Sequence, residues 1–270
     1  MAGSNPAFSS SPAFSSNPQT AAQLRSTAPQ MSAEQLDELY GRPAASPVET
    51  DRMTYEDTIV KTVVSFAVLL AGAAVGWIVP VLALPAALIG FVLALVNIFK
   101  KKPSPALVLS YAVFEGIFVG GISYTFSQMY DGIVTQALLG TLGVVGVTLA
   151  LFASGKVRAS KRATKIFLVA MIGYAAFSLV NMGLMLFGVT DTQFGLRDVT
   201  FMGIPLGAII GVVVVLLAAY SLVLDFDNVK TGVERGAPRI YGWTAAFGIM
   251  VTVVWLYLEI LRLIAIFRSE

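Results

Sequence analysis

The chain has 270 residues, of which 56% are hydrophobic and only 13% are charged. Soluble domains carry about 25% charged residues, so this composition indicates an integral membrane protein. The 18 Lys and Arg residues nearly balance the 16 Asp and Glu residues. This argues against nucleic-acid binding, which needs a concentrated basic face. The chain has no cysteine and no histidine, which excludes disulfides, Cys-based zinc sites and every Ser-His or Cys-His catalytic arrangement.

Residues 1–53 differ in kind from the rest of the chain. They are rich in Pro, Ser and Ala, and Asn5–Ser9 is echoed by Ser11–Ser15. Such a segment buries too little apolar surface to offset the entropy of ordering it. We therefore predict a disordered cytoplasmic tail over residues 1–53 and a transmembrane domain over residues 54–270.

From Ile59 onward, the apolar runs reach the length of roughly 20 residues that a membrane-spanning helix needs. The composition and these lengths predict an all-α integral membrane protein with a bundle of seven transmembrane helices. An alternative is six spans and a partial insertion, because the last run contains Glu259 and Arg262. The predicted spans are Ile59–Val79, Val81–Phe99, Pro105–Thr125, Ile133–Ser154, Ile166–Phe187, Phe201–Leu224 and Tyr241–Leu263.

Loop cations predict the orientation of the bundle, because cytoplasmic loops carry an excess of Lys and Arg. The cations gather in the loops after the second, fourth and sixth spans, whereas the loop after the fifth span has only Arg197. The N-terminus is therefore expected in the cytoplasm and the C-terminus outside. The cations that set this bias are Lys100, Lys101, Lys102, Lys156, Arg158, Lys161, Arg162, Lys165, Lys230, Arg235 and Arg239.

Glycines recur at four-residue spacing in two of the predicted spans. They are Gly116 and Gly120 in the third span and Gly203, Gly207 and Gly211 in the sixth. Small residues at this spacing let helix backbones approach closely within lipid. They indicate a tight bundle and do not mark a pore.

Ionisable side chains within the membrane are costly, so they are candidates for function. Glu115 lies near the middle of the third span, Asp225 and Asp227 end the sixth, and Glu259 lies within the last. Lys61 lies near the inner end of the first span and is expected to reach the interface. For Glu115 the structural alternative is a protonated carboxyl group hydrogen-bonded to a neighbouring helix.

The other three acids also have structural interpretations. The two aspartates can be interfacial carboxylates near Lys230, and Glu259 can pair with Arg262 at helical spacing. A functional interpretation groups them across helices, where neighbouring acids share a proton or bind a cation. Calcium prefers several carboxylate and carbonyl oxygens, and its predicted ligands here are Asp225, Asp227, Asn228 and Glu259.

Three segments resemble proteins of the Bax inhibitor-1 family, in particular its bacterial subgroup. Tyr111–Ser123 resembles the signature of the third helix, and Met53–Asp57, leading into Lys61 and Thr62, resembles the segment before the first. Leu256–Leu263 resembles the final helix, so the resemblance covers roughly residues 50 to 265.

The resemblance implies a bundle in which six helices surround the seventh, and a pH-sensitive calcium leak channel. It further implies a sensor formed by one acid on the sixth helix and one on the seventh. Asp227 best matches the first acid, with Asp225 as the second candidate, and Glu259 matches the other. A cation within Lys100–Lys102 would pair with the sixth-helix acid in the closed state.

Helix depth leaves this pairing open. Counted from Tyr241, Glu259 falls in the outer half of its span, whereas Asp225 and Asp227 lie near the inner face. Either both helices project into the cytoplasm, or the carboxylates do not touch and Glu115 is the better partner at the middle of the membrane.

Two classes of function remain. The first is a proton-regulated leak for cations, with calcium and protons as the ions. The alternative is a non-conducting regulator or scaffold that acts on other membrane proteins. No enzyme is expected, because rhomboid-type proteases need His, a Gly-x-Gly-Asp pattern is missing, and the last span has no lysine for a retinal Schiff base. No organic cofactor is expected, and the cationic loops suit a bacterial plasma membrane.

Overall fold

The computed structural model describes residue 32, residues 51–190 and residues 192–269. Apart from residue 32 and residues 51–53, the predicted tail lies outside these described residues. The described chain is mainly helical, and seven helices are long and apolar enough to cross a membrane. The protein is an all-α, multi-pass integral membrane protein, as the sequence predicts, and it sits in the lipid bilayer.

The helices follow one another with short connections. They are α4 (Tyr55–Ile78), α5 (Ala83–Phe99), α6 (Pro105–Met129), α7 (Ile133–Ala153), α8 (Lys161–Leu186), α9 (Leu206–Glu234) and α10 (Gly242–Arg268). Short 3₁₀ segments lie between them: η2 (Pro80–Leu82), η3 (Gly195–Asp198) and η4 (Arg239–Tyr241). The side chains of Thr54 and Ser160 cap α4 and α8 by accepting hydrogen bonds from amides of the first turn.

Since successive helices alternate in direction, the bundle has two ends, which we name by their charges. The lysine-rich end holds the loops α5–α6, α7–α8 and α9–α10, which carry most of the loop cations. The Arg197 end holds the loops α4–α5, α6–α7 and α8–α9. These names describe position only.

The sixth span differs from its prediction at both ends. Residues 200–205 form a small hairpin of β1 (Thr200–Phe201) and β2 (Ile204–Pro205), so α9 begins only at Leu206. Gly203 has a φ of +81° and lies in the turn of this hairpin, so its predicted place in a helical glycine repeat is wrong. At its other end α9 continues past Leu224, because Val229 is still buried against the bundle.

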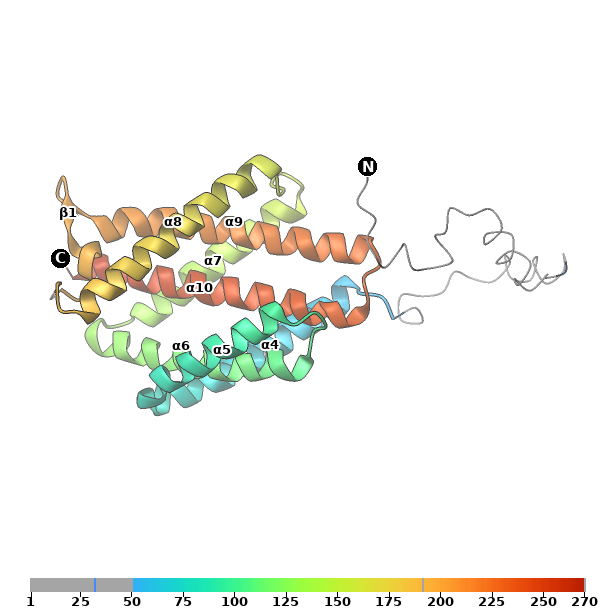
Figure 1. Ribbon diagram of the computed structural model, residues 1–270, viewed down its shortest axis with the longest axis horizontal. Helices are drawn as coiled ribbons and strands as arrows, with labels where there is room; N and C mark the ends of the chain where they lie inside the picture. The colour runs from blue at the N-terminus through green and yellow to red at the C-terminus, as the bar shows by residue number, and fades with distance from the viewer. Residues whose placement is uncertain (1–31, 33–50, 191, 270) are drawn as a thin grey trace. The chain divides into compact units, whose positions relative to one another are not determined.

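Helix α10 is the centre of the helical unit, as the resemblance implies. It runs between α9 on one side and α4 and α6 on the other, and it also contacts α7 (Figure 1). Its buried side chains, among them Met250, Leu256 and Leu261, belong to one core cluster with residues of α4, α6, α7 and α9. A helix enclosed in this way supplies side chains that can act inside the bundle, away from lipid.

The α4–α6 contact depends on glycine. A Cβ added at Gly116 or Gly120 would overlap the carbonyl oxygen of Leu69 or Ala73 of α4, and one added at Gly76 would overlap the Ile117 carbonyl of α6. The two backbones are therefore in direct contact, which confirms the close packing predicted for Gly116 and Gly120.

Helix α8 packs much less than the others. Its only buried residues are Phe167 and Asn181, and its contacts are mainly with η3 and α9. In Figure 1 it crosses the bundle obliquely beside α9. This loose packing leaves room between α8 and the central helix near the Arg197 end.

Candidate functional site

The site at the Arg197 end is built around Glu259 of α10. This side chain is 2% exposed, and its Oε1 atom accepts hydrogen bonds from the Tyr174 hydroxyl of α8 and, at 2.9 Å, from Nη1 of Arg262. The pairing of Glu259 with Arg262 at helical spacing is the structural alternative that the sequence offered, and the ion pair is present. Glu259 therefore lies in a polar network inside the membrane domain.

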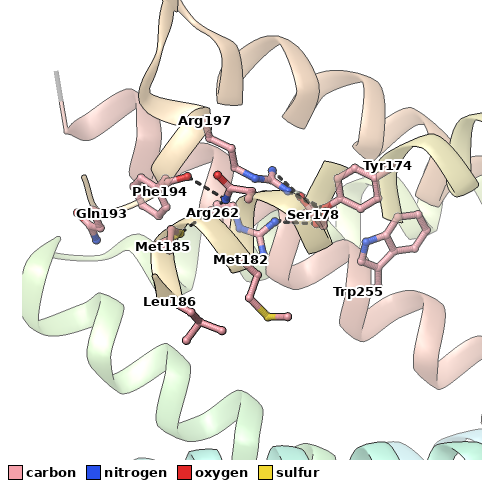
Figure 2. A pocket seen from close by; sticks show the side chains of 12 residues that line it. Tyr174, Ser178, Met182, Met185, Leu186, Gln193, Phe194, Arg197, Trp255 and Arg262 are labelled. Atoms are coloured by element: carbon pink, nitrogen blue, oxygen red, sulfur yellow. Dashed lines mark hydrogen bonds and ion pairs between the residues drawn. The ribbon is translucent and has the colours of Figure 1, made fainter. Parts of the chain in front are cut away.

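Arg197 completes this network from the α8–α9 loop. It is 4% exposed, and its Nη2 donates hydrogen bonds to the Tyr174 hydroxyl oxygen at 3.0 Å and to Ser178 at 3.5 Å. Figure 2 shows Arg197 reaching from its loop toward Tyr174 and Ser178 of α8. Its Nη1 lies 3.9 Å from Oε2 of Glu259, which is within range of an ion pair but too far for a hydrogen bond.

The loop that carries Arg197 is tied to α8 by Asn181. The Asn181 amide nitrogen donates to the carbonyl of Phe194 at 3.2 Å, and its oxygen accepts from the Leu196 amide at 2.6 Å. A third bond, within the loop itself, runs from the Phe194 amide to the Asp198 carboxylate at 2.9 Å. These bonds place the guanidinium of Arg197 beside α10 although the residue is not in a helix of the bundle.

A cavity of about 640 Å³ adjoins this network between α8, the α8–α9 loop and α10 (Figure 2). Its polar wall contains both arginines and Glu259, and its apolar wall includes Met182, Leu186 and Trp255. Two buried polar atoms at the site have no hydrogen-bond partner among the described residues: Nη1 of Arg197 and Oε2 of Glu259. These two atoms are the members of the 3.9 Å ion pair between Arg197 and Glu259, which is too long for a hydrogen bond.

Asp225 forms a second polar site, on α9 nearer the lysine-rich end. Its Oδ2 accepts a hydrogen bond from Thr252 of α10 at 2.7 Å, and the Thr252 hydroxyl is 3.4 Å from that of Ser221. No cation forms an ion pair with Asp225 among the described residues, and α10 carries no charged side chain between Trp243 and Leu258. Within the described chain, the hydrogen bond that holds this carboxyl group comes from the Thr252 hydroxyl.

The predicted pairing of the α9 acid with Glu259 is not present in this structure. Thr252, which contacts Asp225, precedes Glu259 by seven residues of the same helix, about 10 Å along its axis. Glu259 instead faces two arginines at the Arg197 end. The four predicted calcium ligands, Asp225, Asp227, Asn228 and Glu259, are therefore not gathered. The described residues contain no group of three or more acidic side chains that could hold a metal ion.

The remaining predicted residues also lie apart. Glu115 is half-buried in α6 with its carboxylate beside Gly90 of α5, away from α9. Asp227 is half-buried and forms no ion pair within the described chain. Lys100, Lys101 and Lys102 are exposed after α5, and none of them pairs with an acid of the described part of α9.

Lys61 is a buried cation at the lysine-rich end. It donates hydrogen bonds to Asp57 on the same helix and, at 2.6 Å, to the carbonyl of Arg239, while Arg239 pairs with Asp57 at 2.8 Å. The side chain reaches toward the end of the bundle, as predicted, but these partners bury it there. The network joins the start of α4 to the start of the central helix.

Sequence reasoning missed Arg197, Tyr174 and Thr252 as site residues. Arg197 gave a usable signal, because it is the one cation in the loop after the fifth span and a buried Glu259 needs partners beyond Arg262. Tyr174 and Thr252 gave none, since hydroxyl residues are common in such helices and their partners come from other helices.

The chain is a multi-pass helical membrane protein. Its last helix is enclosed by the others, acids lie inside the bundle, and one end has an arginine-containing site. The comparisons with known proteins agree with this class and name it. The sequence model of the family described as Bax inhibitor 1 like matches residues 5–269. The chain belongs to that family, as the resemblance of its third and final helices indicates. No curated protein matches this chain.

Proposed function

We propose that the protein is a pH-regulated leak for cations, with calcium as the permeant ion, and that Asp225 senses the proton. The observation that carries this proposal is the position of Asp225 between α9 and the central helix, held by Thr252 without a cationic partner among the described residues. In this proposal the protein is neither an enzyme nor a holder of an organic cofactor. The membrane is a bacterial plasma membrane, with the lysine-rich end and the N-terminus in the cytoplasm.

The chemistry of the site supports a two-state element. A neutral Asp225 can remain against Thr252, whereas an ionised one needs a counter-ion or water, because charge is poorly solvated inside a bundle. Ionisation would therefore favour separation of α9 from α10 and the entry of a cation. A local change of charge that biases two arrangements of packed helices is a common basis of switching.

Two other acids have supporting places in this proposal. Asp227 lies two residues farther toward the lysine-rich end of α9, and Glu115 lies on α6 within the membrane domain. Either can bind a cation that passes Asp225. Lys100–Lys102 sit at the lysine-rich end, where they would influence ions that enter or leave.

The alternative function is a non-conducting regulator that acts on other membrane proteins. The network around Glu259 favours it, because two arginines beside a single carboxylate form a positive centre at the Arg197 end. A cation that followed the central helix would be repelled there unless this network rearranged.

The proposal is tested by measuring calcium efflux from liposomes that contain the purified full chain. The efflux is measured over the pH range in which protein carboxyls titrate. Asp225→Asn is expected to flatten the pH dependence, because Asn keeps the size of the neutral acid and cannot ionise. Asp227→Asn and Glu259→Gln run beside it, and Glu234→Gln is the matched control because its carboxylate is exposed in a surface pair.

The outcomes separate the two functions. Flux that depends on pH in the unmodified protein and loses this dependence in Asp225→Asn supports the leak and its sensor. If only Asp227→Asn loses the pH dependence of the flux, the sensor is Asp227, as the family resemblance implies. No flux above empty liposomes at any pH contradicts the leak and favours the regulator. Flux indifferent to all of these substitutions moves the sensor to Glu115.

A further inference from the structure

The cavity beside Arg197 and Arg262 has an excess of positive charge. Two guanidinium groups face one carboxylate there, so the network carries a net charge of about +1, because arginine stays protonated. The nearest acid of the same loop, Asp198, accepts a hydrogen bond from the Phe194 amide and does not line this cavity. Among the described residues no second anion balances the site.

The excess charge faces the cavity mainly through Arg262. Nη1 of Arg197 has no hydrogen-bond partner in the described chain and lies 3.9 Å from Oε2 of Glu259, so Arg197 adds positive charge to the wall that it lines. The side chain of Arg262 is 32% exposed and lines the same space. Arginine binds oxyanions with paired N–H donors, and Ser178 and Gln193 on the wall can supply further hydrogen bonds.

The shape of the site indicates what carries the anion. Met182 and Leu186 line the cavity and are 52% and 77% exposed on the outer face of α8, so the space reaches the surface that meets lipid. Trp255 forms another part of the apolar wall. Arg262 lies six residues before the end of α10, about 9 Å along the axis, near the depth at which head groups meet acyl chains.

We propose that this cavity binds an oxyanion, and that its source is the phosphate of an anionic phospholipid. The phosphate contacts Arg262 from the cavity side, with the charge of Arg197 nearby, and an acyl chain follows Met182 and Leu186 out to the bilayer. A free phosphate shares the same chemistry at the arginines but leaves the apolar wall unused. This inference does not depend on ion conduction, so a liposome experiment without flux leaves it unaffected.

Quenching of Trp255 by brominated lipid tests the proposal. The chain has three tryptophans, and Trp77 and Trp243 do not line the cavity, so Trp77→Phe with Trp243→Phe leaves Trp255 as the reporter. The full chain in detergent, freed of lipid, is titrated with brominated phosphatidylglycerol and with brominated phosphatidylcholine. We expect saturable quenching by the anionic lipid and at least about tenfold weaker quenching by the zwitterionic one.

Two arginine variants test the position of the phosphate. Arg262→Gln is expected to weaken quenching by phosphatidylglycerol at least about tenfold, because it removes a charged donor. The matched control is Arg235→Gln, which removes the same charge from an exposed site at the lysine-rich end and should leave the affinity unchanged. If Arg262→Gln fails to fold, the comparison of the two lipids on the unsubstituted cavity still tests whether the cavity selects the anionic lipid.

Three results would overturn the proposal. One is equal quenching by the two lipids, which would mean that ordinary surrounding lipid fills the cavity. Another is an equal loss of affinity for phosphatidylglycerol in Arg235→Gln and Arg262→Gln, which would mean that the lipid is attracted non-specifically by charge. The third is displacement of phosphatidylglycerol by inorganic phosphate at comparable concentration, with chloride of equal ionic strength inactive, which would assign the site to a free oxyanion.

Discussion

Glu259 is the residue whose replacement has the largest expected effect on stability. Glu259→Gln keeps the size of the side chain but leaves Arg197 and Arg262 without a counter-charge inside the bundle. Removing one member of a buried ion pair costs about 3–5 kcal/mol. We expect a large fall in the thermal unfolding midpoint of the detergent-solubilised protein, measured by tryptophan fluorescence.

A surface pair provides the control for Glu259. Glu234 pairs with Lys230 across 3.7 Å, but its side chain is 61% exposed. Exposed pairs contribute about 0–1 kcal/mol, so Glu234→Gln should leave the midpoint nearly unchanged. Equal midpoints for the two variants would show that the network around Glu259 does not hold the helices together.

The hydrogen bond between Ser123 and Tyr257 ties α6 to the central helix. The two hydroxyl oxygens are 2.6 Å apart, and both side chains are buried. Tyr257→Phe should lower the free energy of unfolding by about 1–3 kcal/mol, because the Ser123 hydroxyl is left without this partner. Adding Ser123→Ala to it removes the unpaired group, so the double variant should cost less than the sum of the two single variants. Strictly additive losses would contradict this coupling.

Among the elements, the α4–α6 pair is the most sensitive to added volume. In Gly76→Ala the new Cβ would overlap the Ile117 carbonyl oxygen and lie 2.8 Å from its carbonyl carbon. Both atoms belong to the α6 backbone and cannot turn aside as a side chain can. Overpacking of this kind costs about 1–3 kcal/mol, which a thermal unfolding measurement should detect.

The control for this helix pair is Gly143 of α7, where an added Cβ meets nothing within 4 Å. Gly143→Ala should stabilise the protein by up to about 1 kcal/mol, because Ala is the better helix former. A loss of stability in Gly143→Ala that matches the loss in Gly76→Ala would mean that the backbone contact between α4 and α6 is not the cause.

The elements could be predicted from the sequence more completely than the site. The lengths of the apolar runs locate all seven helices, because a helix that crosses a bilayer needs such a run whichever helices it packs against. The start of α9 could not be placed in this way, because Phe201 and Ile204 are as apolar as the residues of the helix and only the hairpin at Gly203 separates them from it. Likewise Thr252 becomes a partner of Asp225 only through the packing of α9 on α10, which no spacing within either helix reveals.

At the scale of the whole molecule, the two ends are held by networks of the same design, in which one carboxylate joins two cations. At the lysine-rich end, Asp57 joins Lys61 and Arg239 and so links the first helix to the start of the last. At the Arg197 end, Glu259 joins two arginines and links the last helix to the α8–α9 loop. The central helix is thus fixed at both ends, and the segment around Thr252 between them has hydroxyl contacts with Asp225 and Ser221 of α9. In the proposed function, that segment is where ionisation of Asp225 acts on the packing of α9 against α10.

Which end faces the cytoplasm can be tested directly, because the chain has no cysteine of its own. Lys101→Cys places one thiol at the lysine-rich end, and Asp131→Cys places one in the α6–α7 loop at the other. The excess of loop cations predicts that the lysine-rich end is cytoplasmic. A maleimide that does not cross membranes should therefore label Asp131→Cys in intact cells and Lys101→Cys only after permeabilisation. The reverse pattern would invert the whole molecule and place the Arg197 cavity in the inner leaflet, whereas labelling of both thiols in intact cells would mean that the chain inserts in two orientations.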